Sequence, residues 1–302
     1  MMTKFLSAFL AFLLLALPVA AQQEPVFTLN VNVDLVEVHV SVVDGSDRPV
    51  GNLTKENFRL MEDRVLQNIS VFKHEDIPVS LGLVIDNSRS IEPRKQRLDS
   101  AAVSFVRKSN PEDEIFIVHF DDRAWLARDF TANVPELIET LASVKPYGQT
   151  AIYDAIILAL DHMEHAANTK KAILLVTDGV DNVSRHALGE TIEAIKRSRV
   201  AIFPVGLLSL SGGLKAEESL IRIAEASGGR AYFPENVEQA RMVMERVARD
   251  LREQYTLGYF PTNPQHDGAW RSVRVDVIPP AAFPPGFKLI ANYRHGYYGP
   301  KK

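Results

Sequence analysis

The sequence predicts an α/β protein: a doubly wound, mostly parallel, Rossmann-like sheet with a small β unit before it and a β extension after it. Four apolar runs have the length of buried strands, at 81–85, 115–120, 172–176 and 200–205. Continuous apolar runs suit strands that are covered on both faces. Helical periodicity appears between these runs, and strands that alternate with amphipathic helices form parallel sheets through right-handed crossovers.

The first 21 residues have the pattern of a signal peptide. Lys4 precedes a run of apolar and small residues at 5–17, which Pro18 ends, and small side chains at 19–21 suit a signal peptidase. The run of about 13 residues is shorter than the ~20 that a bilayer-spanning helix needs. We expect cleavage near Ala21 and export to the periplasm or the cell exterior, with an N-terminal membrane anchor as the alternative. We expect no membrane span in the mature chain.

Residues 22–77 are predicted to form the small β unit. Apolar side chains alternate along 26–43, which is the period of a half-buried strand. A polar turn follows at 44–49, and two more strand-like pieces lie at 58–62 and 65–72.

Residues 78–250 are predicted to form the main domain, because apolar residues recur there at helical spacing in five segments. These stripes are Leu98, Ala101, Ala102 and Phe105; Ile152, Ala155, Ile156, Ala159, Leu160 and Met163; Leu188, Ile192 and Ile195; Leu220, Ile223, Ala224 and Ser227; and Val237, Ala240, Met244, Val247, Ala248 and Leu251. A (β/α)8 barrel would need eight strand–helix units, and only about five or six can be counted.

Residues 251–302 are predicted to form the β extension. Strand-like segments at 255–260, 272–278 and 287–293 are separated by proline-rich turns. Two arrangements fit this pattern: the extension either lengthens the main sheet or packs with the N-terminal β unit.

Composition excludes several classes of site. The chain has no cysteine, so disulfides, thiolate metal sites and cysteine nucleophiles are excluded. Without the leader, 33 basic side chains face 38 acidic ones, and no lysine- and arginine-rich run suggests a track for phosphates. We therefore expect no nucleic-acid partner.

Oxygen-bearing side chains follow the predicted strands. The first apolar strand leads into Asp86, Ser88 and Ser90, and the third leads into Asp178. Thr150 stands just before a helical stripe. Because ligands of doubly wound sheets bind beyond the carboxyl ends of the strands, we expect these five side chains to converge.

Two carboxylates and three hydroxyls suit a hard divalent ion that keeps some water, namely Mg²⁺ (or Mn²⁺). The set lacks the dense carboxylate cage that calcium selects, and it has no histidine for zinc. Such an ion retains an open coordination position. The predicted last ligand is an acidic side chain, Asp or Glu, of a protein partner.

At these residues the sequence resembles the von Willebrand factor A family. The metal-ion-dependent adhesion site (MIDAS) of that family reads Asp-x-Ser-x-Ser, a distant Thr, and the Asp of Thr-Asp-Gly; Asp86, Ser88, Ser90, Thr150 and Asp178 match all five positions. The resemblance covers about residues 78–250. The flanking segments resemble an exported, Acidobacteria-type bacterial subgroup, in which a Tyr-x-Leu-Gly-Tyr strand, here at 255–259, follows the domain.

Two positions depart from the family's pattern. Arg89 stands where the family usually has glycine, and Gln149 replaces the second glycine of Gly-Gly-Thr. Arg89 either strains the turn or lies beside the metal and grips the incoming carboxylate. We expect Asp154 and Asp181 to orient backbone and water in a second shell around the ion.

Two other polar groups are predicted to be surface features. His162 and His165 are three residues apart on a helix, but no third zinc ligand accompanies them. Asp121 and Asp122 follow a strand end and are interpreted as a polar loop, with a second ion site as the alternative.

The pattern and the resemblance together predict a non-enzymatic, extracytoplasmic binding or adhesion protein. One alternative is a structural module whose metal site is vestigial or only stabilises the fold. A metal-assisted hydrolase is less favoured, because no general base or nucleophile partner is found beside the site.

Export is tested by the N-terminus of the mature protein. Expressed in a bacterial host, it should begin at or near Gln22, because Val19-Ala20-Ala21 fits the peptidase. N-terminal sequencing that finds Met1 still attached would favour the anchored form.

Overall fold

A five-stranded sheet forms the centre of the main domain in the computed structural model, which describes residues 35–207, 213–284 and 286–301. Its strand order is β7-β6-β5-β8-β9. The strands are β5 (Val79–Asp86), β6 (Glu114–Phe120), β7 (Ala124–Thr131), β8 (Lys170–Thr177) and β9 (Ala201–Gly206). All pair in parallel except β7, which is antiparallel to β6. The predicted doubly wound, mostly parallel fold is confirmed, whereas the predicted signal peptide lies outside the described residues.

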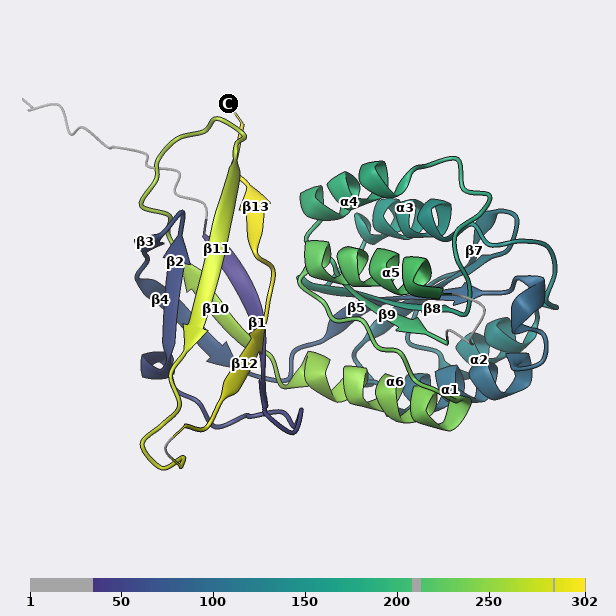
Figure 1. Cartoon of the computed structure of the whole chain (residues 1–302), viewed down its shortest axis with the longest axis horizontal. Coiled ribbons are helices and arrows are strands. Elements are labelled where there is room, and N and C mark those ends of the chain that lie inside the picture. Colours follow the sequence, from purple (N-terminus) through teal and green to yellow (C-terminus); the bar gives the residue numbers. More distant parts are fainter. Residues whose placement is uncertain (1–34, 208–212, 285, 302) are drawn as a thin grey trace, which may run out of the picture. The chain divides into compact units, whose positions relative to one another are not determined.

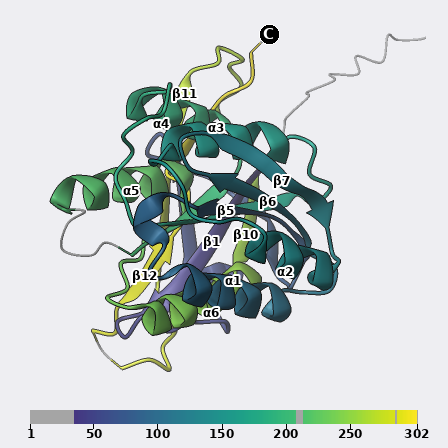
Figure 2. The same ribbon diagram turned by 90° about the vertical axis from the view of Figure 1, so that its right-hand side faces the viewer.

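Helices cover both faces of this sheet (Figures 1 and 2). One core contains side chains of α1 (Lys95–Lys108), α2 (Val134–Ala142) and α6 (Val237–Arg252). The other contains side chains of α3 (Ile152–Met163), α4 (Leu188–Arg197) and α5 (Gly213–Ser227). Successive residues of a strand point into opposite cores, as Leu83 and Val84 of β5 do. Because both faces of these strands are buried, their residues are apolar without alternation.

Two elements of the main domain were not predicted, β7 and α2. Strand β7 is a half-exposed edge strand that includes Arg128 and Asp129, so it contains no continuous apolar run. Helix α2 has nine residues, too few to display a clear helical period, and buries Leu137, Thr140 and Leu141.

The remaining strands form two four-stranded antiparallel sheets. The first has the order β12-β1-β10-β4, the second β13-β11-β2-β3. The bounds are β1 (Val36–Asp44), β2 (Phe58–Glu62), β3 (Val65–Leu66), β4 (Ile69–His74), β10 (Tyr255–Tyr259), β11 (Trp270–Val277), β12 (Leu289–Asn292) and β13 (Gly296–Tyr298). Each sheet combines strands from before and after the main domain, so the C-terminal segment pairs with the N-terminal one and does not lengthen the main sheet. The division of the chain at residues 78 and 251 remains a prediction.

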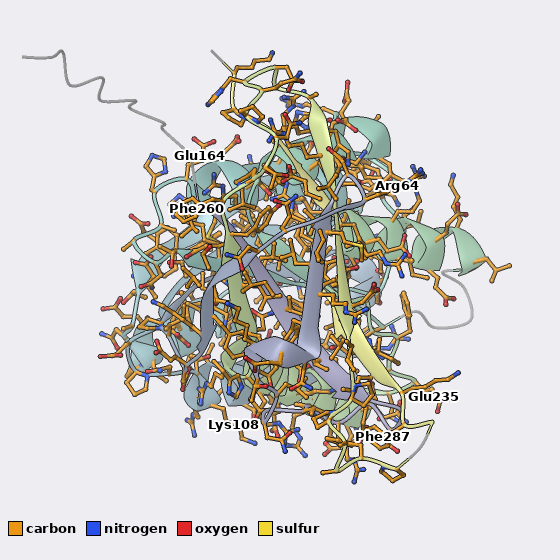
Figure 3. The ribbon with its side chains drawn as sticks, turned by 90° about the vertical axis from the view of Figure 1, so that its left-hand side faces the viewer. Arg64, Lys108, Glu164, Glu235, Phe260 and Phe287 are labelled. Carbon is orange, nitrogen blue, oxygen red and sulfur yellow. The ribbon has the colours of Figure 1, made fainter. Side chains whose placement is uncertain are left out.

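These sheets share an apolar core with Val40, Leu60 and Leu257 at its centre. Figure 3 shows Arg64 in the turn that joins β2 to β3. Asp63 and Arg64 both have positive φ, 46° and 69°, as a two-residue turn between twisted strands requires. Ser272 stabilises this turn by donating its amide and its hydroxyl to Asp63 Oδ1, each at 2.9 Å.

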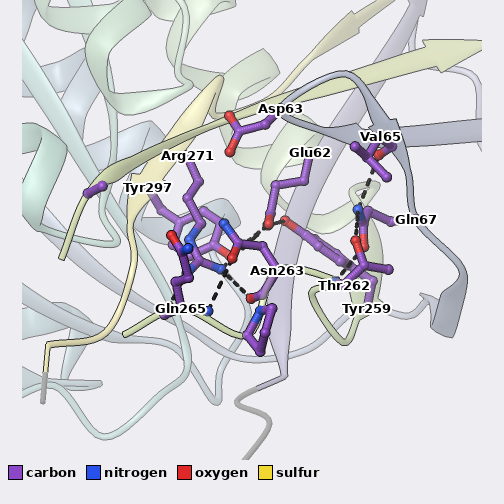
Figure 4. Close-up of polar contacts among 12 residues, drawn as sticks. Glu62, Asp63, Val65, Gln67, Tyr259, Thr262, Asn263, Gln265, Arg271 and Tyr297 are labelled. Atoms are coloured by element: carbon purple, nitrogen blue, oxygen red, sulfur yellow. Dashed lines mark hydrogen bonds and ion pairs between the residues drawn. The ribbon is translucent and has the colours of Figure 1, made fainter. Parts of the chain in front are cut away.

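Glu62 is the centre of a buried polar cluster in this part of the chain (Figure 4). Its carboxylate accepts hydrogen bonds from the hydroxyls of Tyr259 and Tyr297, both at 2.7 Å. Arg271 lies 3.6 Å away, and the side chains of this ion pair are 3% and 1% exposed. Arg271 also donates to the carbonyl oxygens of Asn263 and Gln265, which ties the loop after β10 to β11.

Within residues 35–207, 213–284 and 286–301, no helix is both long enough and apolar enough to cross a bilayer.

Two substitutions in the Glu62 cluster should lower the free energy of unfolding by different amounts. Glu62→Ala should destabilise the protein by about 3–5 kcal/mol, because it leaves a buried guanidinium without its counter-charge. Tyr297→Phe removes a single hydrogen bond and should cost about 1 kcal/mol. Denaturant unfolding of both variants measures the difference; equal costs would show that the Arg271 charge does not depend on Glu62.

Candidate metal centre

The site lies at the carboxyl edge of the main sheet beside β5, where the order in which strands join the sheet reverses. Strand β6 pairs with one side of β5 and β8 with the other, so β5 is the topological switch point. Asp86 is the last residue of β5, and Thr177 is the last residue of β8. Register places Ile85 beside Val176, so the two strand ends deliver Asp86 and Asp178 to the same edge.

Both carboxylate oxygens of Asp86 are hydrogen-bonded within the protein. Oδ1 accepts the backbone N–H of Ser88 at 2.8 Å, and Oδ2 accepts the hydroxyl of Thr177 at 2.6 Å. The residue is 1% exposed. Burial raises the pKa of Asp86 to about 6, and the nearby charge of Asp178 acts in the same direction, while the bonds from Thr177 and Ser88 oppose it. A cation bound at this site would favour the ionised form of Asp86.

A chain of hydroxyls connects the loop after β5 to Asp178. Ser88 Oγ lies 3.0 Å from Ser90 Oγ, and the Ser90 hydroxyl donates to Asp178 Oδ1 at 2.7 Å. Ser88 and Asp178 are buried and Ser90 is exposed, so the chain reaches the surface at its middle residue. Three of the predicted ligands are thus in direct polar contact, and Asp86 joins them through the Ser88 amide.

Thr150 is buried close to these residues without bonding to them. Its Oγ1 lies 3.3 Å from the point that a Cβ on Gly179 would occupy, next to Asp178 in the chain. Among the described contacts, the Thr150 hydroxyl has no hydrogen bond to the other four predicted ligands. Its backbone is held by Asn182, which accepts from Thr150 N at 3.0 Å and donates its own amide to Thr150 O at 3.1 Å.

Asp154 and Asp181 brace the backbone around Thr150. Asp181 Oδ2 accepts Tyr153 N at 3.1 Å and the Ser184 hydroxyl at 2.5 Å. Asp154 accepts the amides of residues 185 and 186 and the ring of His186. Burial opposes ionisation of Asp154, but these hydrogen bonds outweigh it and lower the pKa of Asp154. Their contacts agree with a role in orienting backbone; that they act on a metal stays a prediction.

Arg89 does not strain the turn. It lies in a short 3₁₀ helix (Arg89–Ile91), has no positive φ, and donates its amide to Gly148 O at 3.2 Å. Its side chain is exposed at the edge of the site. Gly148 is the position that needs glycine: its φ is +69°, and a Cβ there would stand 2.6 Å from the carboxylate of Asp122. That carboxylate also accepts the amide of Gln149 at 2.6 Å.

Arg94 is a site residue that the sequence reasoning missed. Its Nη1 lies 2.8 Å from Asp178 Oδ2, in an ion pair whose side chains are 32% and 2% exposed respectively. Arg94 stands four residues after Ser90, a spacing that puts two side chains on one side of a helical turn. That spacing could have indicated Arg94, had a helical start been expected at 89.

His119 is the second site residue that the sequence did not indicate, and it positions Asn87 in the loop after β5. The Asn87 side-chain amide donates to Ile85 O at 3.1 Å and lies 2.6 Å from His119 Nδ1. Nδ1 must therefore accept, so the ring proton is on Nε2, which donates to Thr140 O of α2 at 3.2 Å. Burial lowers the pKa of His119 to about 4, and the neutral ring is the form that this geometry requires.

The donor set fits a hard cation only if hydroxyls take part. Across residues 35–207, 213–284 and 286–301, no three His, Cys, Asp or Glu side chains are grouped so that they could hold a metal ion. The available donors are the Ser88, Ser90 and Thr150 hydroxyls with the Asp178 carboxylate, and Asp86 behind them. Oxygen donors with few carboxylates fit Mg²⁺ or Mn²⁺ bound with several waters.

Acid should destabilise the protein through His119. Between pH 7 and 5 the unfolded histidine, with its usual pKa near 6.5, takes up a proton that the folded ring refuses, so folding loses up to about 1.4 kcal/mol per pH unit. His119→Gln should lower stability at pH 7 and reduce this slope, to which His39, whose pKa burial also lowers to about 4, contributes as well; His165→Gln, an exposed control, should keep the slope. Denaturant unfolding at several pH values measures the slopes. Matching slopes for wild type and His119→Gln would remove the ring from the explanation.

Part of the main domain matches a known protein family. Residues 81–180 match the family model described as von Willebrand factor type A domain. No curated protein matches the sequence significantly.

Solved structures share the fold at low identity. The vWF domain of the type V pili tip protein Mfa5 from Porphyromonas gingivalis superimposes with a TM-score of 0.50 at 14% identity, over 58% of this chain and 95% of that one. A mutant of the PilB minor pilin from Streptococcus sanguinis gives 0.51 at 13% identity, over 59% of this chain and 62% of that one. Proximal thread matrix protein 1 of the mussel byssus, with a zinc-occupied MIDAS motif, gives 0.50 at 20% identity, over 62% and 48%. These matches support the fold of a von Willebrand factor type A domain for the main domain of this chain.

Proposed function

We propose that this protein binds a divalent metal, Mg²⁺ or Mn²⁺, and uses it to dock an acidic side chain of a protein partner outside the cytoplasm. Asp86, Ser88, Ser90, Thr150 and Asp178 hold the ion, directly or through water. The observation that carries the proposal is the polar chain from Ser88 through Ser90 to Asp178, in which the middle residue, Ser90, is exposed at the protein surface. It supplies oxygen donors that reach the surface at Ser90, where a partner can complete the coordination.

The charge of the site supports an acidic ligand. Two carboxylates and a divalent ion sum to zero, and Arg94 then leaves the cluster with a net positive charge. We propose that the exposed Arg89 adds to this potential and pairs with the incoming carboxylate, because a guanidinium can form two parallel hydrogen bonds to it. Adhesion is a binding function, and we propose no reaction for this chain.

The three similar solved structures support the proposed metal site and the proposed location outside the cytoplasm. Their titles name a pilus tip protein, a minor pilin and a thread matrix protein, and one title names a zinc-occupied MIDAS. These agree with a divalent-metal site on an exported protein. The Acidobacteria-type subgroup and export by cleavage near Ala21 belong to the same proposal.

A second candidate is a structural module whose site is vestigial. The observation that favours it is the Arg94–Asp178 ion pair, which already supplies a cation to the buried carboxylate of Asp178. Metal binding by the purified protein separates the two candidates.

Metal binding should stabilise the mature protein. At a metal concentration of 100 times Kd, the stability gain is about 2.7 kcal/mol, and it should appear as a higher unfolding temperature. Asp86→Asn should abolish the gain because it removes a charge while keeping the side-chain size. Asp161→Asn, the same change at an exposed position of α3, should not affect it.

The measurement is thermal unfolding of the three proteins in saturating Mg²⁺ and in EDTA. Identical curves for wild type in both conditions contradict the proposal, although the fold would stand. A gain that survives in Asp86→Asn would place the metal elsewhere.

A further inference from the structure

Asp178 has two oxygens that face different partners. Oδ1 accepts the hydroxyl of Ser90, which belongs to the proposed ligand set, and Oδ2 accepts Arg94 Nη1 at 2.8 Å. The Asp178 side chain is 2% exposed, so water screens this carboxylate poorly. Its only ionic partner among the described residues is Arg94.

The two cations would repel each other. An ion bound at Oδ1 lies a few ångströms from a guanidinium bound at Oδ2 of the same carboxylate, and like charges at that distance interact strongly where solvent is excluded. The carboxylate carries a single negative charge for both of them. Metal affinity and the Arg94 contact are therefore opposed.

Only the side chain of Arg94 is free to move. Its backbone is fixed at the start of α1, where its amide donates to Ile91 O at 2.8 Å and its carbonyl accepts the amides of Arg97 and Leu98 at 3.0 Å. The side chain is 32% exposed, so it reaches solvent without disturbing the helix. A guanidinium that leaves Asp178 thus remains at the mouth of the site.

We infer that Arg94 is a tethered counter-ion that competes with the divalent metal for Asp178. This inference rests on the proposed function. Without metal, the guanidinium neutralises the buried carboxylate and holds Asp178 in position. Metal binding displaces it to the rim, where it becomes available to an acidic ligand together with the metal. Metal binding therefore also exposes the positively charged guanidinium of Arg94 at the rim of the site.

Competition and simple positioning predict opposite results for Arg94→Gln. If Arg94 competes, its removal should tighten Mn²⁺ binding about tenfold, the scale of one charge-assisted contact. If Arg94 instead holds Asp178 in the metal-binding orientation, its removal should weaken binding. Arg97→Gln, the same change at an exposed position of the same helix, should leave the Mn²⁺ affinity within about twofold of wild type.

The experiment titrates Mn²⁺ into wild type, Arg94→Gln, Arg94→Lys and Arg97→Gln, following free Mn²⁺ by electron paramagnetic resonance. Arg94→Lys keeps the charge and should bind close to wild type. Thermal unfolding of the same proteins supplies a second readout. Competition predicts that Arg94→Gln melts below wild type in EDTA and recovers most of the difference in saturating Mn²⁺.

The outcomes separate the inference from the proposed function. If wild type binds Mn²⁺ and Arg94→Gln binds it equally or more weakly, competition is overturned and the metal site stands. If Arg94→Gln melts below wild type by the same margin with and without Mn²⁺, the contact is only structural, and competition is again overturned. If neither protein binds Mn²⁺ at millimolar concentration, the proposed function is wrong and the inference falls with it.

Discussion

The rest of the site depends on the need to satisfy the buried carboxylate of Asp86. A charged group so far from water is tolerated only when it is hydrogen-bonded or paired. One of its oxygens bonds to the amide of Ser88, which forces the loop after β5 to turn back at once. The other bonds to the hydroxyl of Thr177, which fixes β8 beside β5 at its last residue. The turn then presents Ser88 and Ser90, and the strand end presents Asp178.

The site combines fixed and adjustable parts. Asp86, Asn87 and His119 are buried and hydrogen-bonded to neighbouring groups, so they set the geometry. Ser90, Arg89 and Arg94 reach the surface, and their side chains have room to exchange partners. A buried frame with an adjustable rim suits docking, in which the frame must persist while the rim meets a ligand.

Local patterns predicted much of this structure, and nonlocal contacts account for what was missed. Apolar runs identified β5, β6, β8 and β9, since strands buried on both faces need apolar residues throughout. The positions of Asp86, Ser88 and Ser90 after a buried strand predicted that their side chains converge, and the structure brings the hydroxyl oxygens of Ser88 and Ser90 to 3.0 Å from each other. Arg94 reaches a partner 84 positions away in sequence, a distance over which no periodicity carries information. Edge strand β7 lacked an apolar run because one side of it has no neighbour, and the pairing of β1 with β10 was one of two arrangements that the pattern left open.

The interleaving of the two antiparallel sheets has a consequence for how this chain folds as it is made. Strand β1 pairs with β10, and Val36 opposes Tyr259, so the whole of the main domain is synthesised between the two partners. The main domain has mostly local strand–helix–strand connections and can fold as soon as it emerges. Strands β1, β2 and β4 must wait with unpaired edges until residues 255–298 arrive, and closing so long a loop is slow. During translation this chain therefore carries exposed β edges ahead of a folded domain, which makes its nascent N-terminal strands the segment that most needs protection from aggregation.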